Sequence, residues 1–485
     1  MKFTSLTYLL FLPLVFALHW SSSDRKRQNA VLLFASYVFY GWWDWRFCGL
    51  MLASTLVDFT VGQRLDRAEA PGLRRALVAV SVCVNLGILG FFKYFNFFAE
   101  SAQTAAAQVG WNVHPVTLKV ILPVGISFYT FQTMSYVIDV YRRRLPAARS
   151  LLDYATYLSF FPQLVAGPIE RGQRLLPQFQ GPRRFDVEQA EDGARQMLWG
   201  VVKKMLIADQ LALVADQVYA TPGAFTGPQL AFATVCFAFQ IYCDFSAYSD
   251  IAIGTARLFG VGLMRNFAHP YLSQSLGEFW RRWHISLSTW FRDYVYIPLG
   301  GGRGGRGRRA LNVMVTFLLS GLWHGASWNF VIWGGINGAG VLPEVLSRNR
   351  NTGKATDVPL GEGRWPAPRA IGRVALTFMV VTLAWVFFRA ADLPQALGIL
   401  GTIATDALRP GAWTPAGLHK ANAALGVVLI GALVAVEWVT RRWAHPFEAI
   451  RSWPRSLRWA LYTGLLWGTL YLTPPESNPF LYFQF

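Results

Sequence analysis

The chain has 485 residues, of which 53% are hydrophobic and 15% aromatic, and its 45 Lys and Arg residues outnumber its 27 Asp and Glu residues. The apolar residues are gathered into long segments, a pattern that is typical of integral membrane proteins and excludes a soluble or disordered chain. The formal charge of +18 is concentrated in short loops between those segments, so it indicates membrane orientation and contact with anionic membrane lipids rather than with nucleic acid.

Candidate membrane spans, taken as runs of roughly 17 to 25 mostly apolar residues, follow one another along the whole chain. They predict a multi-pass, all-α membrane protein with about 11 to 13 transmembrane or re-entrant helices, organised as a single domain over residues 1–485. The first segment is not followed by a small-x-small cleavage pattern, so we expect it to be retained as a span. The segments lie near 3–20, 29–43, 46–62, 76–98, 116–138, 152–168, 195–218, 228–261, 310–323, 328–346, 370–388, 422–440 and 457–473.

Segment 265–299 differs from its neighbours because it mixes charged residues with many aromatic rings. Such a mixture favours a helix that is buried in protein or lies in the membrane interface. The loop 300–309 follows and consists almost entirely of Gly and Arg. Its backbone NH groups and the guanidinium groups of Arg303 and Arg306 could hold a polyanionic ligand. A cytoplasmic loop without a ligand is the alternative, and the two interpretations are compatible.

Two of the seven histidines, His284 and His324, lie in the most apolar part of the chain. An ionisable side chain at membrane depth is costly and is therefore a candidate for function. A buried imidazole can take a proton from an attacking hydroxyl and return it to a leaving group, which suits acyl transfer. The alternative for His324 is a structural hydrogen bond to a neighbouring helix, and for His284 a packing and charge role beside Arg281 and Arg282.

Asp244 lies with several other polar residues inside the apolar span 228–261, so we expect it to face the protein interior and to hydrogen-bond there or line a tunnel. The carboxylates and histidines of the chain do not have the spacing of a metal-binding motif, and we expect no metal.

Four strings together resemble the membrane-bound O-acyltransferase family. They are most similar to its bacterial polysaccharide branch, which is typified by the alginate O-acetylation membrane proteins, and more distantly to the D-alanyl transfer proteins of teichoic acid modification. The resemblance runs from the N-terminal spans to the last residue. The strings are Leu122-Pro-Val-Gly-Ile-Ser-Phe-Tyr-Thr-Phe131, Gln240-Ile-Tyr-Cys-Asp-Phe-Ser-Ala-Tyr-Ser-Asp-Ile-Ala-Ile-Gly254, Phe279-Trp-Arg-Arg-Trp-His-Ile-Ser-Leu-Ser288 and Gly321-Leu-Trp-His-Gly-Ala326.

The resemblance implies a ring of helices around a central tunnel, with His324 matching the family's invariant histidine and His284 its partner. Trp283 and Trp323, which precede these histidines, are further candidates for contact with substrate. Alginate-type members often carry another histidine in the span after Gly-Leu-Trp-His-Gly, whereas this chain has Asn337 there. We therefore expect that position to bind substrate rather than to act as a base.

The C-terminal segment 477–485 ends in Phe-Leu-Tyr-Phe-Gln-Phe and resembles a terminal motif of this branch, in which the tyrosine is proposed to carry the acyl group as an ester. A phenol with a pKa of about 10 forms an aryl ester that keeps much of the transfer potential of a thioester, which makes Tyr482 a plausible acyl relay. The alternative for Tyr482 is an aromatic anchor at the membrane interface.

These residues predict an O-acetyltransferase of the bacterial cytoplasmic membrane. Acetyl-CoA or another acyl thioester would be the donor, and His324 would be the general base. The resemblance implies an extracytoplasmic serine-hydrolase-like acetyltransferase as partner and an exported polysaccharide such as alginate or cellulose as final acceptor. A multi-span transporter or channel, and a non-catalytic scaffold for polysaccharide modification, are the alternatives.

Overall fold

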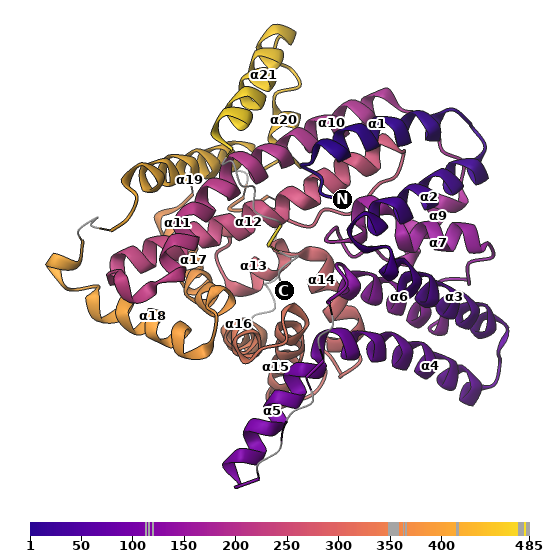
Figure 1. The fold of residues 1–485 in the computed structure, drawn as a ribbon, viewed down its shortest axis with the longest axis horizontal. Helices are drawn as coiled ribbons and strands as arrows, with labels where there is room; N and C mark the ends of the chain where they lie inside the picture. Colours follow the sequence, from indigo (N-terminus) through magenta and orange to yellow (C-terminus); the bar gives the residue numbers. More distant parts are fainter. Residues whose placement is uncertain are drawn as a thin grey trace. The chain divides into compact units, whose positions relative to one another are not determined.

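The computed structural model is all-α over the residues that it describes, as the sequence predicts (Figure 1). These are all residues except 112–113, 115–116, 119–120, 348–357, 362, 364–365, 414–416, 474–479 and 482–485. The chain divides into two compact units. Unit 1 comprises Met1–Ala194 and Ala252–Met264, and unit 2 comprises Arg195–Ile251 and Arg265–Phe485. A ring of helices around a tunnel stays a prediction.

Unit 1 begins with four helices that follow the predicted spans, and the chain of unit 2 is also helical along most of its described length. The helices up to residue 201 are α1 (Leu6–Trp20), α2 (Arg25–Asp44), α3 (Arg46–Arg67), α4 (Pro71–Leu89), η1 (Gly90–Tyr94), α5 (Phe95–Gln108), α6 (Ile126–Tyr141), α7 (Leu151–Ser159), α8 (Phe161–Leu164), α9 (Gly172–Gln180) and α10 (Val187–Val201). The next are η2 (Val202–Ala208), α11 (Asp209–Ala220), η3 (Pro222–Ala224), α12 (Gly227–Leu258), η4 (Pro270–Leu272), α13 (Leu276–Arg282), α14 (Ile285–Phe291) and η5 (Arg292–Tyr296). The last are α15 (Arg306–His324), α16 (Trp328–Leu346), α17 (Pro368–Arg389), α18 (Leu393–Asp406), η7 (Pro410–Trp413), α19 (Lys420–Thr440), α20 (Pro446–Ala449) and α21 (Arg455–Leu472).

The predicted spans coincide with helices, with one break and one omission. The segment 152–168 is interrupted at Phe160, because Pro162 begins a new short helix, α8, at a position where its missing N–H is not needed. The helix α18 was not predicted. Among the described residues, four helical segments have the length and hydropathy of a membrane crossing: Pro71–Gln108, Gly227–Leu258, Pro368–Arg389 and Lys420–Thr440. The total number of crossings remains a prediction.

Unit 1 is held together by a buried carboxylate on α3. Asp58 accepts hydrogen bonds from Ser81 and Asn85 of α4, at 2.6 and 2.7 Å, and from Thr133 of α6 at 2.6 Å. Three helices with different positions in the sequence thus satisfy one acceptor. A buried carboxylate that lost these partners would be strongly destabilising, so this contact specifies how α3, α4 and α6 pack.

The long helix α12 lies inside the protein, whereas other apolar helices face outward. Its most apolar 18-residue window is 83% buried, against 22% for the Pro71–Gln108 segment and 28% for α19. Apolar side chains that are exposed in the protein are suited to lipid contact. The polar residues of α12 therefore face other protein groups, in agreement with the expectation for Asp244.

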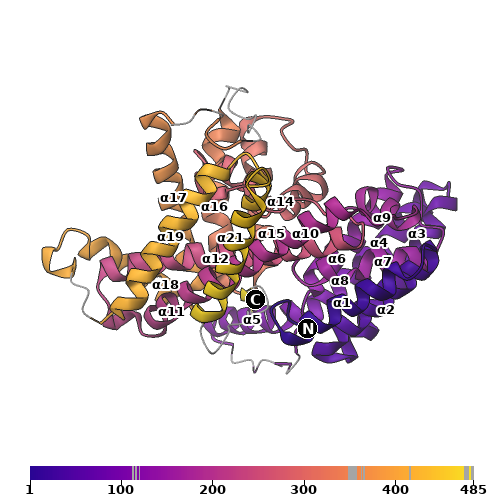
Figure 2. The same cartoon turned by 90° about the horizontal axis from the view of Figure 1, so that it is seen from above.

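Helices α15 and α16 lie side by side in unit 2 and approach closely at two glycines (Figures 1 and 2). A Cβ added at Gly321 would lie 2.2 Å from the Phe330 carbonyl oxygen, and one at Gly334 would lie 2.4 Å from the Phe317 carbonyl oxygen. No side chain fits at these distances. Glycine is therefore required here for close helix approach, which sets where the C-terminal end of α15 lies.

We expect Gly334→Ala to lower the free energy of unfolding by about 1–3 kcal/mol, because the two helices must separate to admit the methyl group. Gly335→Ala is the matched control, since its Cβ would meet Leu318 at an ordinary 3.6 Å. Thermal unfolding of both variants in detergent measures the difference. Equal midpoints for the two variants would contradict the close approach at Gly334.

Candidate active site

His284 lies at the break between two short helices, α13 and α14, and has a left-handed backbone with φ 43° and ψ 54°. This conformation is uncommon for a residue other than Gly, Asn or Asp, and such strain is concentrated at functional sites. The break is stabilised from outside: Asn266 accepts the Ile285 N–H at 2.9 Å through its carbonyl oxygen, and the Ser286 hydroxyl at 2.9 Å through its side chain. The fold therefore holds His284 in one orientation.

His324 is the last residue of α15, and Gly325 follows it as the C-cap. A Cβ at Gly325 would lie 2.1 Å from the Phe330 ring, so glycine is required for the chain to turn into α16. The His324 ring contacts Trp333 of α16, with centroids 5.0 Å apart, and Phe388 of α17 at 5.5 Å. Aromatic rings from two further helices thus surround the imidazole.

The structure brings the two histidines together within unit 2. Their ring centroids are 6.2 Å apart, and the residues are 0% and 3% exposed. Phe245 of α12 packs edge-on against His284 at 4.6 Å. Burial and the neighbouring His324 lower the pKa of His284 well below its usual value. His284 is therefore neutral at neutral pH, so one ring nitrogen carries a proton and the other is an acceptor.

A cavity of about 420 Å³ lies in the same unit. Ser288 and Ser320 line it, and each is four residues, or about one helical turn, from one of the two histidines. Trp280 also lines the cavity and packs against Trp333, with centroids 5.5 Å apart. Trp333 in turn contacts His324. The cavity and the histidine pair are therefore built from the same helices.

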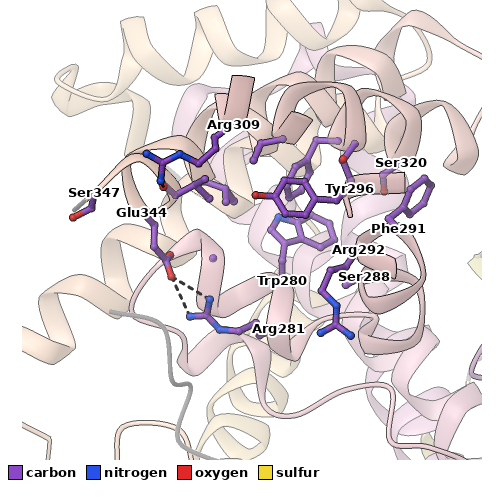
Figure 3. Close-up of a pocket in the computed structure, with 16 residues that line it drawn as sticks. Trp280, Arg281, Ser288, Phe291, Arg292, Tyr296, Arg309, Ser320, Glu344 and Ser347 are labelled. Atoms are coloured by element: carbon purple, nitrogen blue, oxygen red, sulfur yellow. Dashed lines mark hydrogen bonds and ion pairs between the residues drawn. The ribbon is translucent and has the colours of Figure 1, made fainter. Parts of the chain in front are cut away.

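The cavity combines apolar walls with three arginines, Arg281, Arg292 and Arg309. In Figure 3 the rings of Trp280 and Tyr296 are seen between Arg309 on one side and the other two arginines on the other. Arg281 forms an ion pair with Glu344 at 3.1 Å, and Arg292 forms one with the adjacent Asp293 at 2.8 Å. The arginines outnumber these two acidic partners. Such a site suits an anionic ligand that has an apolar part.

The sequence-predicted residues fall into three groups. Trp323 contacts both His284 and His324, with centroids 5.9 and 5.0 Å apart. Trp283 instead lies in an aromatic cluster against Trp385 at 5.2 Å. Asn337 accepts a hydrogen bond from Trp280 at 3.3 Å, which places it behind the cavity wall.

The remaining predicted residues lie away from the two rings or are not described. Asp244 is buried and forms an ion pair with Lys204 at 2.6 Å. Arg303 and Arg306 are exposed, and neither is among the residues that line the cavity. Tyr482 lies outside the described residues, as does most of segment 477–485. Within the described part of the chain, no group of three or more His, Cys, Asp or Glu side chains could hold a metal ion.

Sequence reasoning missed the cavity-lining Ser288, Ser320 and Arg309. The two serines could have been found from helical spacing, because residues four apart lie on one face of a helix. Arg309 could not be separated from Arg303 and Arg306, since all belong to one Gly- and Arg-rich stretch.

Comparison with known proteins identifies the family. The model of the membrane-bound O-acyltransferase family matches residues 141–354, which include both histidines. A probable alginate O-acetylase of Azotobacter vinelandii is 37% identical over the full length of both chains. The chain belongs to the membrane-bound O-acyltransferase family. A peptidoglycan O-acetyltransferase of Helicobacter pylori is 33% identical over 82% of this chain and 78% of its own. A teichoic acid D-alanyltransferase of Streptococcus thermophilus is 28% identical over 54% of this chain and 67% of its own.

The resemblance found in the sequence is therefore confirmed. The protein is an O-acyltransferase of the bacterial cytoplasmic membrane with several membrane-crossing helices, and it uses an acyl donor. Neither a transporter or channel nor a non-catalytic scaffold describes a member of this family.

Proposed function

We propose that the protein transfers an acetyl group from acetyl-CoA, or from a related thioester, toward the hydroxyl groups of an exported polysaccharide. The observation that carries this proposal is the buried pair of His284 and His324 beside a cavity that is apolar and rich in arginine. An acetyl thioester of a phosphate-bearing carrier has the same combination of apolar and anionic parts. The guanidinium groups of Arg281, Arg292 and Arg309 would hold its phosphates.

In the chemical step His324 acts as general base. It takes the proton of the attacking hydroxyl, whose oxygen forms a bond to the thioester carbonyl carbon. The carbon–sulfur bond then breaks, and the leaving thiolate takes the proton back from His324, so that free thiol and a new oxygen ester are the products. The neutral His284 ring donates its N–H to the oxyanion that develops on the carbonyl.

The first acceptor in this scheme is the phenol of Tyr482, and the aryl ester then passes its acetyl group to an extracytoplasmic transferase and to the polysaccharide. The names of two relatives, an alginate O-acetylase and a peptidoglycan O-acetyltransferase, support a bacterial glycan as the final acceptor. Alginate and cellulose are both compatible with this scheme.

Mass spectrometry of the C-terminal peptide after incubation with labelled acetyl-CoA tests the proposal. We expect the label on the peptide that contains Tyr482, and we expect none in Tyr482→Phe, which keeps the ring but lacks the oxygen that forms the ester. An unlabelled Tyr482 in a preparation that acetylates its glycan would contradict the relay and favour direct transfer. Failure to turn over any thioester would contradict the donor.

A further inference from the structure

Three charged side chains form a buried cluster in unit 2. The Lys204 ammonium lies 2.6 Å from a carboxylate oxygen of Asp244 on α12 and 2.8 Å from one of Asp209 on α11. All three side chains are 3% exposed. One cation faces two carboxylates, so the cluster needs a further hydrogen-bond donor to satisfy its remaining acceptors.

The chain's own C-terminal segment supplies that donor. The backbone N–H of Leu481 donates to the second oxygen of Asp244 at 2.7 Å. The preceding Phe480 lies with its ring centroid 4.8 Å from the Lys204 ammonium and 5.3 Å from the Tyr248 ring. Phe480 and Leu481 are 2% and 7% exposed. The end of the chain is thus seated on α12 by an amide bond to a charged group, a cation–π contact and a ring contact.

The seat lies next to the candidate active site along α12. Asp244 holds Leu481, and the following residue, Phe245, packs against His284 at 4.6 Å. Tyr482 is the next residue after Leu481, and consecutive Cα atoms are about 3.8 Å apart. Fixing residue 481 therefore restricts the position of residue 482 closely.

We infer that Asp244 and Lys204 form a docking site for residues 480–481 and act as positioning residues for acyl transfer to the C-terminal segment. The positioning role rests on the proposed function of Tyr482, whereas the docking itself does not. The sequence treated Asp244 as a residue that binds substrate. Here its substrate is the protein's own acyl-carrying end.

The neighbouring Lys203 and Asp250 provide an internal control. They form an equivalent ion pair at 2.6 Å between the same helical segments, and Lys203 also donates to Ser246 at 2.7 Å. In Asp244→Ala, Lys204 keeps Asp209 as its partner, so the variant removes the C-terminal seat without leaving a buried ammonium unpaired.

Docking is measured by the rate at which a maleimide modifies Leu481→Cys in a protein whose four native cysteines are replaced by Ala. We expect Asp244→Ala to raise that rate about tenfold, the effect of losing one hydrogen bond to a charged group. Asp250→Ala should leave it unchanged. Equal rates with and without Asp244, or the same increase in Asp250→Ala, would overturn the proposal.

The positioning role is measured by comparing Leu481→Pro with Leu481→Ala. Both shorten the buried side chain, but only proline removes the N–H that Asp244 accepts. We expect label transfer to the C-terminal peptide to be about tenfold slower in the proline variant, with the same KM for acetyl-CoA. Equal transfer would overturn the positioning role. If Tyr482 is not labelled even in the native protein, the relay fails, and the maleimide rates still decide whether the segment docks.

Discussion

His324→Ala is expected to lower the rate of acyl transfer by about 10²–10⁴-fold, the usual contribution of a positioned general base. Its KM for the thioester should change little, because the arginines that we propose for donor binding lie in the cavity and are left intact. The measurement is release of free thiol from acetyl-CoA by purified protein, together with acetylation of the C-terminal peptide.

The expectation rests on the surroundings of the ring. His324 is 3% exposed and packs against Trp333 and Phe388, so bulk water is not available to replace it as base. His445→Ala is the matched control, because it removes another buried histidine from the same unit. We expect that variant to retain transfer per folded molecule. Full activity in His324→Ala would remove the assignment of the base.

His284→Gly is expected to lower the rate by about 10²–10³-fold, as in other enzymes that lose one donor to the oxyanion. Glycine is chosen because His284 has φ 43°, and alanine at that position would add backbone strain to the loss of the ring. His284→Asn is the rescue variant. Asparagine also tolerates the left-handed conformation and keeps an N–H donor, so we expect it to recover part of the rate.

The pH dependence provides an independent test of His284. Its pKa is lowered by burial and by His324, so the ring is neutral at neutral pH and stays neutral as the pH falls through the usual histidine range. The acidic limb of the kcat profile should therefore be the same in His284→Asn as in the native protein. A limb that disappears in the asparagine variant would show that His284 titrates in that range.

Sequence reasoning found both histidines because an ionisable residue among apolar segments is conspicuous at any distance from its partners. It could not place Arg309 in the cavity ahead of Arg303 and Arg306, because the side of α15 that faces α13 and α16 depends on where the helix begins. It also expected Asp244 to contact substrate. The carboxylate instead pairs with Lys204 and the Leu481 N–H, two groups 40 and 237 residues away along the chain.

The order of apolar segments and the local strings around residues 240–254, 279–288 and 321–326 were enough to establish a helical membrane protein and its family, since hydrophobicity and short motifs are properties of contiguous residues. The approach of His284 to His324, the left-handed break that orients the first ring and the seat of the C-terminal segment on α12 depend on packing. The glycines of α15 and α16, the Asn266 hydrogen bonds and the Lys204 cluster each join residues that are distant in the sequence, and such contacts exist only once the helices have met.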